Sequence, residues 1–213
     1  MFGYEKIMVK MVDWLAMNND IISEAVMDFA LAASKKINMI YIKELIKKDI
    51  VTLLIALLKS DKEPLIVKSC KVFAAIGWTE LSNKLIEKQL YKDIVALTSK
   101  ESNTIKRASI LALFSIYEKS SIDRLQKVDL ASSFDIGINY AMINIKDERF
   151  LETFLRSCYE MFSKGDEEHT NFMSMFQAAK GVELLEKIYS FSNQEIRALS
   201  DRIQERIEHE FDD

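Results

Sequence analysis

One short pattern recurs at nearly constant spacing along the chain, and it constrains the fold more than any other feature of the sequence. Asp49-Ile50, Asp93-Ile94 and Asp135-Ile136 begin three similar segments, and Gly181-Val182 begins a fourth. Successive starts lie 44, 42 and 46 residues apart, and each is followed by an apolar stretch, a polar break and a longer amphipathic stretch. A unit of this kind cannot bury its apolar side alone and must stack on the next unit. The spacing therefore predicts a helical repeat protein.

Polar breaks mark the places where we expect the last helix of each unit to begin. They occupy residues 59–62, 100–103, 145–147 and 191–193. Ser60 with Glu63, and Ser192 with Glu195, have the spacing of a capping box, which satisfies the free N–H groups at a helix start. Pro64 follows in the first turn, where its missing N–H group costs nothing.

Composition and periodicity both favour an all-α fold. The chain has only 5 Gly and 1 Pro, the residues that tight turns between strands consume. Apolar residues recur at helical spacing in two later stretches, and we expect them to be buried. They are Leu151, Phe154, Leu155, Cys158, Met161 and Phe162, and then Ile196, Leu199, Ile203 and Ile207.

The repeat period and the last 40 or so residues resemble known repeat proteins. A unit of about 40–47 residues is typical of armadillo and HEAT repeats. The last unit resembles the C-terminal armadillo repeat of the importin-alpha family. The residues that carry this resemblance are Asn171, Phe176, Ala178-Ala179, Gly181-Val182, Glu186-Lys187-Ile188, Asn193-Gln194-Glu195-Ile196 and 208–213. The resemblance implies a right-handed α-α superhelix of about five repeats, forming a single solenoid over residues 1–213. The approximate repeats are 1–40, 41–83, 84–126, 127–168 and 169–213.

The importin-alpha family binds basic localisation peptides through Trp and Asn residues that are paired one helical turn apart. This chain offers only Trp78 with Asn83, which are five residues apart. The corresponding helices from Ile105, Phe150 and Ile196 contain no Trp. The resemblance therefore does not carry nuclear-import cargo binding over to this chain.

The net charge limits the kind of partner, and the cysteines indicate the compartment. The net charge of −4 divides into +3 over residues 1–106 and −7 over residues 107–213, a poor match for a general nucleic-acid binder. The N-terminus lacks a signal-peptide pattern, and the longest apolar run, 50–58, is too short to span a bilayer. Cys70 and Cys158 lie in apolar stretches, so we expect buried, reduced thiols in a cytoplasmic or nucleocytoplasmic protein.

The residues that usually carry catalysis or metal binding are scattered. His169 and His209 have no second ligand at metal-binding spacing, and no Gly-rich phosphate loop is present. Neither Cys70 nor Cys158 has a nearby His in sequence to activate it. We therefore expect no catalytic residues, no bound metal and no cofactor.

One group of residues is a candidate for partner binding. Lys68, Lys71 and Trp78 lie within about 80° of one another around one helix, and Lys106 with Arg107 could extend the strip on the next repeat. Two lysines beside an indole suit an acidic peptide that carries an aromatic side chain. The alternative is that Trp78 packs into the core between repeats and the lysines are ordinary solvated charges.

A contrasting acidic strip lies in the second half of the chain. It comprises Glu148, Glu152, Arg156, Asp201 and Glu205. Together with the basic strip it would favour a partner segment of definite polarity, although surface charge without a role explains it equally well.

The sequence therefore predicts a non-catalytic protein-binding scaffold or adaptor. We expect it to hold a segment of another protein, and no nucleic acid, in a groove lined by the last helix of each repeat. An armadillo-type co-chaperone acting on Hsp70 or myosin is the alternative, and a HEAT-repeat nucleic-acid enzyme is a less favoured one. The oligomeric state stays open.

Overall fold

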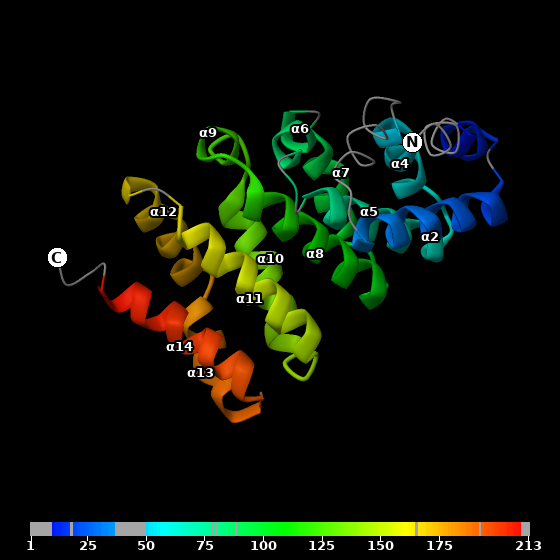
Figure 1. Cartoon of the computed structure of the whole chain (residues 1–213). Helices are drawn as coiled ribbons and strands as arrows, with labels where there is room; N and C mark the ends of the chain where they lie inside the picture. Colours follow the sequence, from blue (N-terminus) through cyan, green and yellow to red (C-terminus); the bar gives the residue numbers. More distant parts are fainter. Residues whose placement is uncertain are drawn as a thin grey trace. The chain divides into compact units, whose positions relative to one another are not determined.

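The computed structural model describes residues 10–17, 19–36, 50–77, 79, 81–87, 89–164, 166–191 and 193–209. All regular structure within these ranges is helical, which agrees with the all-α prediction (Figure 1). The chain divides into two compact units, an N-terminal unit of residues 1–119 and a C-terminal unit of residues 120–213. We describe each unit by itself.

A helical segment over residues 10–16 and six named helices make up the described part of the N-terminal unit. The helices are α2 (Asp20–Lys36), α4 (Ile50–Leu58), α5 (Glu63–Gly77), α6 (Ser82–Glu87), α7 (Leu90–Leu97) and α8 (Asn103–Lys119). The core forms where α5 packs against both α2 and α8.

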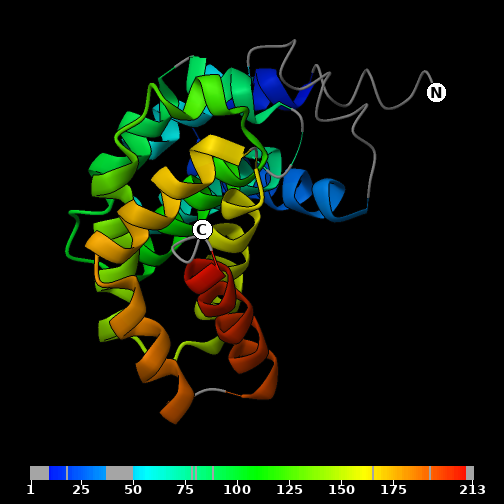
Figure 2. The ribbon, with the colours of Figure 1, turned by 90° about the vertical axis from the view of Figure 1, so that its left-hand side faces the viewer.

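Six helices also make up the described part of the C-terminal unit. They are α9 (Ile122–Leu125), α10 (Leu130–Ile143), α11 (Glu148–Phe162), α12 (Asp166–Ala178), α13 (Gly181–Phe191) and α14 (Gln194–His209). Helices α13 and α14 lie side by side, as two views of the ribbon agree (Figures 1 and 2).

The long helices carry the repeat. They begin at Asp20, Glu63, Asn103, Glu148 and Gln194, so that successive starts are 40 to 46 residues apart. Each of α8, α11 and α14 follows two shorter helices. The exact division of the chain into five repeats stays a prediction.

The similar segments found in the sequence do not all begin where a helix begins. Ile50 and Gly181 are the first residues of α4 and α13, but the other two Asp-Ile pairs lie inside helices. Asp93 lies one turn inside α7, and Asp135 lies in the middle of α10. The residue that caps α10 is Asp129, whose carboxylate accepts a hydrogen bond from the Ser132 N–H at 3.1 Å. Asp49 lies outside the described residues.

The polar breaks separate helices as predicted, but the capping chemistry differs from the capping-box pattern. Ser60 Oγ accepts a hydrogen bond from the Lys62 N–H at 3.0 Å, which closes a turn before α5 begins at Glu63. At the start of α14 the cap is Asn193, whose Oδ1 accepts from the N–H groups of Glu195 at 3.0 Å and Ile196 at 3.1 Å. Ser192 lies outside the described residues.

Gly77, which has no side chain, allows α5 to approach α8 closely. A Cβ atom on Gly77 would lie 2.8 Å from both the backbone nitrogen and the Cγ1 of Ile116, and 2.9 Å from its Cα. Side chains at both positions could not fit, so the two backbones come this close only because Gly77 has none.

Aromatic rings fill the core of the C-terminal unit. Phe134 of α10, Phe162 of α11 and Phe176 of α12 form a triangle with ring centroids 5.4 to 6.4 Å apart. The edge-to-face geometry of both Phe176 pairs is the favoured one for aromatic contacts. Every residue of the two apolar stripes predicted from the sequence is buried.

Candidate functional site

Lys68, the first residue of the predicted basic strip, is occupied by carboxylates of its own chain. Its Nζ donates to Glu24 Oε2 at 3.2 Å and to Asp28 Oδ2 at 2.9 Å, both on α2. The hydrogen bond to Asp28 is the main reason why the pKa of Lys68 is raised. Lys68 is therefore a bridge between α5 and α2 rather than an isolated cation.

Lys71 lies one turn further along α5 and has a different environment. It is exposed, and its side chain forms no ion pair or hydrogen bond with a described residue. The residues on the opposite side of α5, Ile66, Cys70 and Phe73, are buried. Trp78, which the sequence places on the Lys71 side, lies outside the described residues, so its orientation stays a prediction.

Lys106 and Arg107 lie near the start of α8, the helix that packs closely on α5, and both are half-buried. Consecutive residues of a helix point about 100° apart, so these two side chains do not share a face. Arg107 lies on the same side as the exposed Thr104 and the half-buried Leu111. The structure thus places Lys71 and Arg107 on neighbouring helices, while Lys68 pairs with α2.

The acidic strip of the C-terminal unit is partly a structural network. Glu148 Oε2 accepts a hydrogen bond from Asn193 Nδ2 at 3.1 Å, which joins the starts of α11 and α14. Glu152 pairs with Arg156 one turn along α11. Glu148 therefore links two long helices, whereas Glu152 pairs within its own helix.

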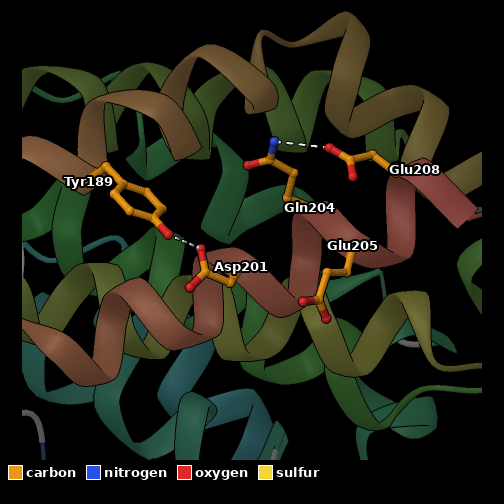
Figure 3. A pocket seen from close by; sticks show the side chains of 5 residues that line it. All are labelled: Tyr189, Asp201, Gln204, Glu205 and Glu208. Atoms are coloured by element: carbon orange, nitrogen blue, oxygen red, sulfur yellow. Dashed lines mark hydrogen bonds between the residues drawn. The ribbon is translucent and has the colours of Figure 1, made fainter.

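An open hollow of about 520 Å³ lies on α13 and α14 and collects the remaining acidic residues (Figure 3). It is lined by Tyr189, Asp201, Gln204, Glu205 and Glu208. The side chains on α14 fall at i, i+3, i+4 and i+7, one face of a helix. Tyr189 comes from α13, and its ring is half exposed.

Two internal hydrogen bonds organise the hollow (Figure 3). Tyr189 donates its hydroxyl to Asp201 Oδ1 at 2.6 Å, and this bond raises the pKa of Tyr189. Gln204 Nε2 donates to Glu208 Oε1 at 3.0 Å. Three carboxylates beside a partly open ring make a site that attracts a cation.

Sequence reasoning found part of this hollow. Asp201 and Glu205 belonged to the predicted acidic strip, whereas Tyr189, Gln204 and Glu208 were not part of it. The spacing on α14 was a usable signal for Gln204 and Glu208. Nothing in the sequence showed that Tyr189 meets Asp201, because that contact joins two helices.

Cysteine chemistry is suppressed by burial. Cys70 and Cys158 are both free thiols with no exposed surface. Burial raises the pKa of Cys70 to about 12 and raises that of Cys158 as well, so neither forms the reactive thiolate. The prediction of buried, reduced thiols is confirmed.

Within the described ranges no group of three or more His, Cys, Asp and Glu side chains could hold a metal ion. The side chains of His169 and His209 lie outside what the structure describes. No helix of the described chain has both the length and the apolar character that a bilayer crossing requires.

Comparison with known proteins decides the fold type. No family model and no curated protein matches the chain. A designed armadillo repeat protein solved in complex with the peptide (KR)4 superposes with a TM-score of 0.79 at 18% identity, over 94% of this chain and 81% of the other. The chain has an armadillo-type repeat fold.

Two further solved structures agree with the armadillo assignment. A computationally designed armadillo repeat protein for modular peptide recognition has a TM-score of 0.77 at 17% identity, over 93% of this chain and 81% of the other. Another designed armadillo repeat protein has a TM-score of 0.62 at 16% identity, over 94% and 99% of the two chains. The prediction of an all-α armadillo solenoid is confirmed.

Proposed function

We propose that this armadillo-type chain is a non-catalytic scaffold that binds a segment of another protein against its long helices. Two of the similar solved structures are described as a complex with the peptide (KR)4 and as a design for modular peptide recognition, which supports peptide binding for this fold. No observation favours a co-chaperone acting on Hsp70 or myosin, or a nucleic-acid enzyme.

The hollow on α13 and α14 is the observation that carries the proposal. It presents Asp201, Glu205 and Glu208 to solvent beside the ring of Tyr189. The C-terminal unit has 11 Lys and Arg against 19 Asp and Glu, a net charge of −8, which adds a long-range attraction for basic segments. The segment that fits this hollow carries Lys or Arg.

The N-terminal unit has the opposite character and is proposed to contact an acidic stretch. It carries 18 Lys and Arg against 14 Asp and Glu, a net charge of +4. The exposed Lys71 is the principal contact, with Arg107 and Lys106 on α8 and Trp78 beyond the described residues. Lys68 contributes less, because two carboxylates already hold it.

Binding of a fluorescent (KR)4 peptide at low salt tests the hollow. The double variant Glu205→Gln with Glu208→Gln should weaken binding roughly three- to tenfold, as expected for two partly screened charges. The matched control removes the same charge from exposed carboxylates of α13, with Glu183→Gln and Glu186→Gln. An equal loss in both variants would mean that only net charge matters, and no binding at all would refute the proposal.

An acidic peptide of the same length, (DE)4, tests the N-terminal unit. Lys71→Ala should weaken its binding roughly two- to fivefold and leave (KR)4 binding unchanged, because a single exposed charge contributes this much. Lys84→Ala is the control, since Lys84 is also exposed but lies on the short helix α6. If both lysine variants behave alike, the basic strip of α5 is not a binding site.

A further inference from the structure

We infer that the acidic stripe of α2 determines specificity on the neighbouring α5 face: it neutralises Lys68, so that Lys71 is the lysine of α5 that a bound acidic segment contacts. The inference rests on the proposed function, because it concerns which segment that face accepts. The stripe consists of Asp20, Glu24 and Asp28, which fall at i, i+4 and i+8 on one side of the helix.

Each member of the stripe faces a lysine on or just before α5. Asp20 pairs with Lys62 at 3.9 Å, and Glu24 and Asp28 both pair with Lys68, at 3.2 and 2.9 Å. The cluster of Lys68, Glu24 and Asp28 therefore has a formal charge of −1. A partner carboxylate that approaches Lys68 meets a net negative charge, although the sequence of α5 alone shows only a cation.

Asp28 occupies the place that a partner's carboxylate would take. Its side chain is 62% exposed, while that of Lys68 is 21% exposed, so Asp28 lies on the solvent side of the pair. Asp28 also makes the shorter of the two contacts with Lys68. A bound acidic side chain would have to compete with it directly.

The helix that carries the stripe does not depend on Asp28 for its packing. Val26, Met27 and Ala30 of α2 are all buried, with exposed fractions of 4% or less. Neutralising the exposed Asp28 carboxylate should therefore leave α2 in place. The stripe acts through its charge, and this is what the variants change.

Binding of the (DE)4 peptide to the full chain tests the inference. Asp28→Asn should bind the peptide about two- to fivefold more tightly than the natural chain, the gain expected from releasing one exposed ion pair. The same substitution combined with Lys68→Met should lose the gain, because no cation is then released. Asp13→Asn is the matched control, since it removes the same charge from an exposed position on the preceding helix.

The outcomes separate the inference from the proposed function. Binding that depends on Lys71 but is equally strong in Asp28→Asn and Asp13→Asn would overturn the specificity role and keep the proposed site. A gain in Asp28→Asn that persists without Lys68 would also overturn it. If neither the natural chain nor any variant binds (DE)4, both the proposed basic site and its acidic boundary are refuted.

Discussion

Substituting Gly77 by Ala tests the close approach of α5 to α8. The new Cβ would lie 2.8 Å from the backbone nitrogen of Ile116, whereas ordinary contacts begin at 3.4 Å. Helices α5 and α8 would have to separate by about 0.6 Å at this crossing, since a backbone atom cannot rotate away. Overpacking of a tight core costs about 1–3 kcal/mol.

Helix propensity acts in the opposite direction. Ala is favoured over Gly by about 1 kcal/mol inside a helix, and by less at the last residue of α5. The net expectation is a destabilisation of roughly 1–2 kcal/mol, from the difference of these two terms. A lower stability of Gly77→Ala would therefore indicate the close helix crossing, and a higher stability would indicate that helix propensity dominates.

Urea denaturation followed by circular dichroism measures this effect. The Gly77→Ala midpoint should fall while the slope of unfolding free energy against urea stays constant, because the surface exposed on unfolding is unchanged. Ala75→Gly is a useful comparison, since Ala75 is half-buried on the same helix and its substitution reports mainly propensity. An unchanged or raised midpoint for Gly77→Ala would refute the close crossing.

Four further outcomes follow from single residues. Asn193→Ala should cost about 1–2 kcal/mol in urea unfolding, because the cap of α14 is lost, and an effect near zero would contradict the cap. Lys180→Gly should stabilise by up to about 1 kcal/mol, because Lys180 has a φ of 67°; a lower urea midpoint would argue against this conformation. Hydrogen bonds from Ser132 lower the pKa of Asp129, so its stabilisation is present above the unfolded pKa and is lost as pH falls through the folded value. The stability difference from Asp129→Asn should therefore shrink in acid, and a difference independent of pH would contradict the bond. Cys70 and Cys158 should react with a thiol reagent only in denaturant, and rapid labelling of the native chain would show that they are accessible.

The surroundings of the proposed binding residues were only partly predictable from the sequence. Lys71 was correctly placed on an exposed face, because burial on the opposite side of α5 follows from the apolar spacing. Lys68 lies on the same side of α5 as Lys71. Its partners Glu24 and Asp28, however, come from α2, 40 or more residues earlier in the chain. Sequence spacing along one helix carries no information about charges on its neighbour.

The sequence by itself determined which segments form helices, the spacing of the long helices and the residues that they bury. These properties depend on local periodicity and on polar breaks, which act within one or two turns of chain. The tertiary structure alone decided how α5 meets α8 at Gly77, which carboxylates hold Lys68, and how Tyr189 reaches Asp201. Each of these contacts joins two helices. Whether it forms depends on how the two helices cross, and close packing of the core sets that crossing.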